Sequence, residues 1–116
     1  MAWDGDDHIY LFPGSGYGYL AYDWYRYSVS QDSWEALDSL PHMQGPGNAA
    51  IWVDAEASGL DQDYLYVQFG LVPHGNYTQA EFWRYGLTSE TWEQMASHGY
   101  GADDGSMLAW DGGRYL

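Results

Sequence analysis

Short segments in which aromatic or apolar residues alternate with polar or charged ones recur along the whole chain. Residues 24–27 and 64–67 show the pattern most clearly, because alternate positions carry two unlike sets of side chains. Successive side chains of a strand point to opposite faces, so this alternation predicts β-strands. The stretches between them are rich in Gly, Asp and Ser, which is typical of hairpin turns. No segment predicts a convincing helix; residues 92–96 resemble one helical turn, but the internal repeat of the chain assigns them to a strand.

The chain contains a gapless internal repeat. Residues 24–35 align with residues 82–93 at a constant spacing of 58 residues. Both copies begin with two aromatic residues, and the polar composition at the centre of each is typical of a hairpin loop. Such a repeat indicates a fold built from similar supersecondary units. The residues that are identical at matched positions are Arg26 and Arg84, Tyr27 and Tyr85, Trp34 and Trp92, and Glu35 and Glu93.

A second element, a Trp-Asp segment, occurs three times, at residues 2–4, 51–54 and 108–111. Each copy precedes an Asp/Gly-rich turn and then a segment rich in Tyr and Leu. Together with the first repeat, this order predicts units of four short antiparallel strands and an all-β fold. The chain then holds about two units and the beginning of a third, with boundaries near residues 1–45, 46–100 and 101–116.

These motifs resemble the kelch repeat, in which a Tyr is followed seven residues later by a Trp across a polar hairpin. Kelch blades also carry a Gly-Gly doublet after their second strand, and this chain keeps half of it at Gly14 and at Gly70. The resemblance covers nearly the whole chain and implies four-stranded blades of a β-propeller. The matching pairs are Tyr27 with Trp34 and Tyr85 with Trp92.

The resemblance also implies an incomplete ring within one chain. A kelch propeller usually holds about five to seven blades, whereas this chain supplies about two. Two blades alone would expose flat faces meant to pack on neighbouring blades through residues such as Trp3, Trp52 and Trp110, and soluble monomers rarely expose such areas. We therefore expect self-association, with a trimer closing a six-bladed ring, or a place within a longer propeller. An open arrangement of the same contacts would form a fibre.

A duplicated segment bears on whether the chain associates with itself or belongs to a longer propeller, since residues 109–112 nearly repeat residues 2–5. In a closed ring the two segments would compete for one place, unless one is displaced or is taken up by a neighbouring chain. Strand exchange between chains explains the duplication, and so does a fragment of a longer propeller.

Charge narrows the range of partners. Three Arg and no Lys oppose seventeen acidic residues, which gives a net charge of −14. Nucleic acids and anionic membranes are excluded as partners by this balance, because both are polyanions. A solubilising acidic surface explains the charge; adaptation to high salt and Ca²⁺ binding are further explanations. No apolar run is long enough for a membrane helix and no signal peptide is visible, so we expect a soluble protein of unknown compartment.

Two groups of loop residues are candidates for ligand binding. Carboxylates at alternate positions beside Gly can ligate Ca²⁺, although Asp side chains that bond their own turn backbone give the same pattern. The Gly/Tyr-rich loops between the second and third strands offer adaptable aromatic surfaces for another protein or a glycan. No other cofactor is expected. The candidates are Asp4, Asp6, Asp61 and Asp63 for Ca²⁺, and Tyr17, Tyr19 and Tyr77 for aromatic contacts.

The remaining chemistry argues against an enzyme. Cysteine is absent and the G-x-S-x-G nucleophile motif does not occur. Arg26 and Arg84 recur at one position of the repeat, which favours a structural ion pair with an acidic residue on the next strand (Glu35 or Glu93), or stacking on Trp, over ligand binding. We therefore expect a non-catalytic binding or scaffold module that associates with itself. A purely structural, fibre-forming subunit is the alternative.

Overall fold

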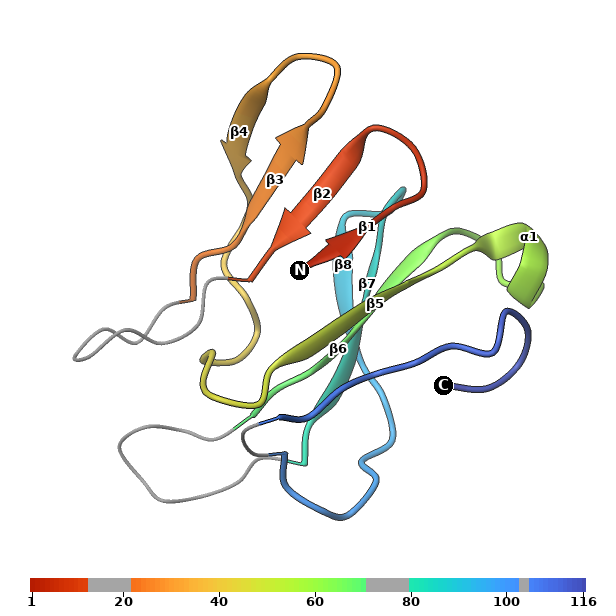
Figure 1. The fold of residues 1–116 in the computed structure, drawn as a ribbon. Coiled ribbons are helices and arrows are strands. Elements are labelled where there is room, and N and C mark those ends of the chain that lie inside the picture. The colour runs from red at the N-terminus through yellow and green to blue at the C-terminus, as the bar shows by residue number, and fades with distance from the viewer. Residues whose placement is uncertain (13–21, 71–79, 103–104) are drawn as a thin grey trace.

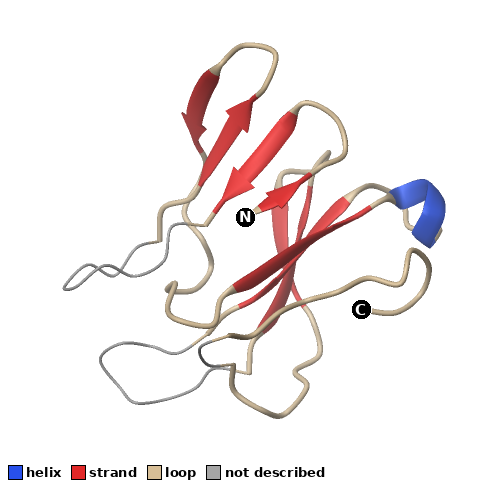
Figure 2. Ribbon diagram, viewed as in Figure 1, coloured by secondary structure: helices blue, strands red, loops and turns tan. Residues whose placement is uncertain are grey.

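The computed structural model describes residues 1–12, 22–70, 80–102 and 105–116, and it contains two four-stranded antiparallel sheets (Figures 1 and 2). In each sheet every strand pairs with the next strand in sequence. The predicted all-β class and the predicted four-stranded units are confirmed. Sheet 1 contains β1 (Ala2–Trp3), β2 (His8–Leu11), β3 (Tyr25–Ser28) and β4 (Ser33–Ala36). Sheet 2 contains β5 (Ala49–Val53), β6 (Tyr64–Gln68), β7 (Phe82–Gly86) and β8 (Thr91–Gln94).

The register of the two sheets follows the internal repeat. Tyr27 lies opposite Trp34 across β3 and β4, and Tyr85 lies opposite Trp92 across β7 and β8. The two rings are in contact in both sheets, with their centroids 5.0 Å apart. Each fourth strand begins one residue before the predicted Trp. The two copies of the repeat therefore form the same strand pair twice.

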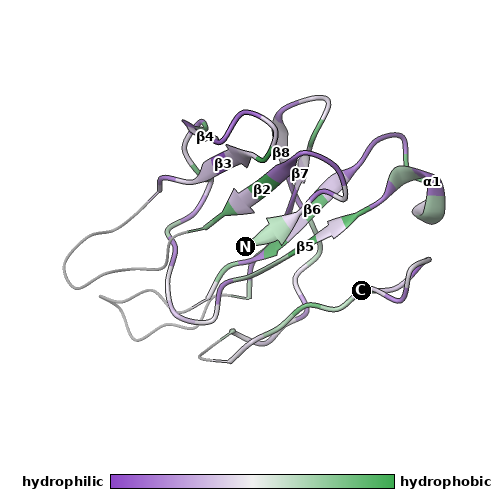
Figure 3. Ribbon diagram, turned by 45° about the horizontal axis from the view of Figure 1, so that its top comes forward, coloured by the Kyte–Doolittle hydropathy of each residue, from purple (hydrophilic) through white to green (hydrophobic). Residues whose placement is uncertain are grey.

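The main core lies between the two sheets and is centred on Trp24, which is 1% exposed. The Trp24 ring lies 4.7 Å from the Tyr85 ring and 5.2 Å from the Trp92 ring, so a residue of the first unit reaches across to sheet 2. Hydrophobic and hydrophilic residues alternate along β2 (Figure 3). Each large apolar side chain buried here contributes roughly 1.5–3 kcal/mol. The other buried members are Ala2, Tyr10, Leu40, Leu65, Val67 and Phe69.

The position of Gly70, just after β6, leaves no room for a side chain. A Cβ atom at this position would lie 1.9 Å from the carbonyl oxygen of Pro46, in the linker between the two sheets. The Gly70 N–H donates to Asn48 Oδ1 at 2.7 Å. Only glycine allows the end of β6 to approach the linker so closely. Gly14, its counterpart in the first unit, lies outside the described residues.

One short helix differs from the sequence prediction. Helix α1 (Ala55–Ser58) follows β5, and the Asp54 side chain caps it by accepting a hydrogen bond from the Ala57 N–H. Gly59 ends the helix with a left-handed φ of 74°. The prediction of no helix was wrong because a single turn leaves no periodic pattern, although the capping residues on either side are a readable signal. No helix in the described part of the chain is long and apolar enough to cross a membrane.

The third copy of the Trp-Asp segment forms a turn where strands were predicted. No strand is assigned within residues 105–116, so the prediction of strands there was wrong. A strand requires a hydrogen-bonded ladder with a neighbour, whereas the Asp111 N–H donates to the Tyr115 carbonyl oxygen (3.2 Å) and closes a local turn. The segment runs along the side of sheet 2 that is directed away from sheet 1 (Figures 1 and 3).

Candidate functional site

Each sheet carries a row of four residues that lie side by side across its strands on one face. Residues directly opposite one another on neighbouring strands share a face. The row in sheet 2 packs into the main core, and we call it the buried row. The equivalent row in sheet 1 is directed away from sheet 2, and we call it the open row. The buried row is Trp52, Leu65, Tyr85 and Trp92. The open row is Trp3, Ile9, Tyr27 and Trp34.

The two rows match in position but differ in exposure. Trp3 and Trp34 are 58% and 57% exposed, whereas their counterparts Trp52 and Trp92 are partly buried and pack against the main core. Large aromatic side chains are mostly buried in soluble proteins, so two exposed Trp in one row give this face of sheet 1 an unusual apolar character. The open row is an unpartnered copy of a surface that already packs on a sheet within this chain.

The contact between the sheets extends to the turn between β1 and β2. Gly5 has a φ of 81°, and a Cβ atom built on it would lie 2.7 Å from the Trp52 ring. The indole of sheet 2 therefore lies directly against the glycine turn of sheet 1, at a distance that only glycine permits. A further sheet stacked in the same way would place its own Trp against sheet 2.

The face of sheet 2 directed away from sheet 1, here called the far face, carries a second apolar cluster. Val53, Tyr64 and Tyr66 are buried there, and Trp110 packs against them. Trp110 belongs to residues 107–116, which we call the C-terminal segment. A cavity of about 220 Å³ remains between this segment and sheet 2. The C-terminal segment thus covers part of the far face.

The C-terminal segment also repeats the first turn of the chain in its hydrogen bonds. The Trp3 indole N–H donates to the Asp6 carbonyl oxygen at 3.0 Å, and the Trp110 indole N–H donates to the Gly113 carbonyl oxygen at 2.9 Å. In both turns the central Gly has a φ of 81°. In both, the Asp that follows the Trp accepts two backbone N–H bonds through one carboxylate oxygen. The turn of the duplicated sequence is therefore hydrogen-bonded in the same way in two places, although only Ala2–Trp3 is also paired in a strand.

The two repeated arginines form cross-strand ion pairs. Arg26 donates to Glu35 Oε2 through Nε (3.1 Å) and Nη2 (2.6 Å), and Arg84 contacts Glu93 Oε2 at 2.8 and 2.7 Å. The predicted pairing is confirmed at both positions, and Arg84 stacks on Tyr64 (4.2 Å) instead of on a Trp. The bond to Glu35 raises the pKa of Arg26. Both Glu side chains are about 60% exposed, so each pair contributes only about 0.2–1 kcal/mol and chiefly orients its Arg.

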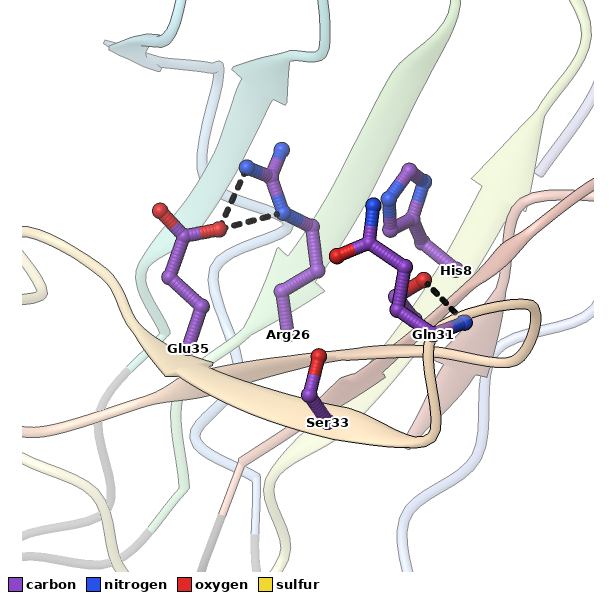
Figure 4. A pocket seen from close by; sticks show the side chains of 6 residues that line it. His8, Arg26, Gln31, Ser33 and Glu35 are labelled. Carbon is purple, nitrogen blue, oxygen red and sulfur yellow. Dashed lines mark hydrogen bonds and ion pairs between the residues drawn. The ribbon is translucent and has the colours of Figure 1, made fainter.

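A polar cavity of about 350 Å³ opens beside Arg26 (Figure 4). Its Arg is already engaged by Glu35, which leaves little free positive charge for an anionic ligand. Ser28 Oγ donates to Asp7 Oδ2 at 2.7 Å, and this bond lowers the pKa of Asp7. Because the Ser28 hydroxyl points to a carboxylate and not to His8, these residues form no nucleophile–base pair. The other lining residues are Gln31 and Ser33.

Asp4, Asp61 and Asp63 accept hydrogen bonds from groups of their own loops, which is the alternative that the sequence left open beside Ca²⁺ binding, and Asp6 takes part through its backbone N–H. Among the residues that the structure describes, no three His, Asp or Glu side chains converge in a way that could hold a metal ion. The bonds are from the Asp6 and His8 N–H groups to Asp4, from the Ala55 N–H to Asp63, and from the Tyr64 hydroxyl to Asp61.

The aromatic loop candidates Tyr17, Tyr19 and Tyr77 lie outside the described residues. The stacking surfaces were only partly predictable. The repeat indicates the three Trp as packing residues, but it gives no such indication for Ile9 and Tyr66 on the second strands. Alignment of β2 with β6 by the register of the repeat would have indicated these residues, because it shows which second-strand positions share a face with the first strand.

Neither the comparison with protein-family models nor the comparison with curated proteins finds a match to this chain. The kelch resemblance therefore stays a prediction from sequence motifs.

Proposed function

We propose that this chain is a non-catalytic, kelch-type binding or scaffold module that completes a propeller by stacking blades. Sheets 1 and 2 are consecutive blades, and further blades come from other copies of the chain or from the rest of a longer one. The observation that supports this most directly is the open row, which matches the buried row position by position yet faces solvent. Covering its apolar surface stabilises an assembly by about 25 cal/mol per Å².

Self-association would follow the contact already present within the chain. The open row of one copy packs on the far face of sheet 2 in another, as the buried row packs on sheet 1. This contact joins two different surfaces, so it is heterologous and closes only if the rotation between copies fits a ring. Three two-blade copies form a six-bladed ring. A rotation that does not close gives a fibre, and the chain would then be a structural subunit.

Sedimentation velocity over a wide range of concentrations tests this proposal with Trp34→Ser. We expect the wild-type chain to form a uniform trimer and the variant to associate at least about tenfold more weakly, because a large aromatic contact is lost. Tyr22→Ser is the matched control: Tyr22 is a 42% exposed aromatic residue that precedes β3 and belongs to neither the open row nor the far face, so its loss should change nothing. Long polymers would favour the structural subunit. A wild-type chain that stays monomeric throughout would contradict self-association.

A further inference from the structure

We infer that the far face of sheet 2 is the docking surface for the β1–β2 hairpin of a second copy, and that the C-terminal segment occupies this surface within its own chain. This inference rests on the proposed self-association. The C-terminal segment then acts as a cap that a second copy must displace.

The first support is position. The repeat aligns Trp3, Trp52 and Trp110. Trp52 packs in the core between the sheets, and Trp110 packs on the next surface along, the far face. Suppose that sheet 1 of a second copy packs on the far face in the way that sheet 2 packs on sheet 1. The Trp3 side chain of the second copy then lies where Trp110 lies now. Two indoles cannot fill one site, so docking of the second copy and capping by the C-terminal segment exclude each other.

The second support is shape. The hairpin turn of β1–β2 and the turn of the C-terminal segment share the indole-to-carbonyl bond, the left-handed glycine and the two N–H bonds to an Asp carboxylate. Asp4 and Asp111 hold these bonds in the two turns. A surface that accommodates one turn therefore accommodates the other without rearrangement.

The third support is charge complementarity. Arg26 Nη1 of sheet 1 lies 3.9 Å from Glu90 Oε1, which belongs to the β7–β8 turn of sheet 2. The repeat spacing relates Arg26 to Arg84 and Glu90 to Asp32. In the stacked arrangement Arg84 thus faces Asp32 of the second copy. Opposite charges at this distance chiefly set the register of the contact.

The C-terminal segment is held more weakly than a docked sheet would be. It has no strand ladder to sheet 2, and the cavity of about 220 Å³ beneath it is unfilled by side chains. Met107 and Tyr115 are 86% and 71% exposed, so Trp110 is its principal anchor. A complete four-stranded sheet brings four row residues to the same face, which favours displacement of the segment.

The test is sedimentation velocity of Trp110→Ser beside the wild-type chain. Loss of the anchor should tighten self-association by about tenfold, because the surface no longer has to be uncovered. Met107→Ser lies in the same segment at an exposed position and should associate like the wild type. Circular dichroism of each variant shows whether the sheets remain folded.

A second measurement does not depend on the folding of a variant. A synthetic peptide of residues 105–116 added to the wild-type chain should compete for the far face and weaken association, whereas the same peptide carrying Trp110→Ser should not. If the wild-type chain associates but Trp110→Ser associates equally or less well, or if neither peptide has an effect, the inference is overturned and self-association stands. If no form of the chain associates, both proposals fail.

Discussion

Tyr85, in the buried row, makes the stability of the fold depend on pH in the alkaline range. Its ring contacts those of Trp24 and Trp92, and burial raises the pKa of its phenol to about 12. An unfolded Tyr ionises near pH 10, so the folded state holds this proton more tightly than the unfolded state does. The free energy of unfolding is therefore intact below about pH 10 and falls as the pH rises toward about 12.

We predict that Tyr85→Phe reduces this alkaline loss of stability. Phe keeps the ring in the buried row and removes the ionisable hydroxyl, so neutral stability should change little. Urea unfolding at a series of pH values from about 8 to about 11 measures the slope. Tyr115→Phe, at a 71% exposed site, is the control and should follow the wild type. An equal alkaline decline in Tyr85→Phe would show that the buried phenol does not cause it.

At the scale of elements, the β1–β2 turn and the turn of the C-terminal segment allow the cost of overpacking to be measured apart from the cost of a left-handed backbone. Gly5→Ala places a Cβ atom 2.7 Å from the Trp52 ring, whereas Gly112→Ala, at the same φ of 81°, meets no atom within 4 Å. A left-handed Ala costs about 1 kcal/mol at either site, and overpacking adds about 1–3 kcal/mol only at Gly5. We predict that Gly5→Ala lowers the free energy of unfolding by about 2–4 kcal/mol and Gly112→Ala by at most about 1 kcal/mol in urea unfolding. Equal losses would mean that Trp52 does not press on the turn.

The strands and their pairing were predictable because hairpins join residues close in sequence. The polar loop between Tyr27 and Trp34 sets their register, and the same loop recurs in the second unit. Exposure was not predictable in this way. Trp3 and Trp52 occupy one repeat position, yet only Trp52 is covered, because what stacks on a sheet is a long-range property absent from the local pattern.

The side chains that accept hydrogen bonds from the two hairpin turns could not be predicted by aligning identical residues of the repeat. The Asp7 carboxylate accepts the Ser30 N–H in sheet 1, and the Gln62 amide oxygen accepts the Thr88 N–H, its counterpart, in sheet 2. The two side chains perform one task from neighbouring positions of the repeat and differ in type. Alignment by residue identity therefore misses Gln62, whereas the unpaired N–H groups of the turn would have indicated that some acceptor must be nearby.

For the whole molecule, net charge opposes the proposed self-association through the open row. Two copies that each carry a charge of −14 repel one another, and the repulsion reaches about 10 Å at 0.1 M salt but only about 3 Å at 1 M. Burial of apolar rows is not weakened by such screening. Association should therefore tighten as salt rises.

We predict that raising NaCl from about 0.05 to about 1 M strengthens self-association of the wild-type chain, measured by sedimentation velocity at fixed pH. Trp34→Ser has the same charge, so it should associate more weakly at every salt concentration but with the same dependence on salt. Weakening with salt would instead mean that ion pairs such as the one expected between Arg84 and Asp32 hold the copies together. In that case the apolar rows would set only how the sheets fit together, and charge would supply the affinity.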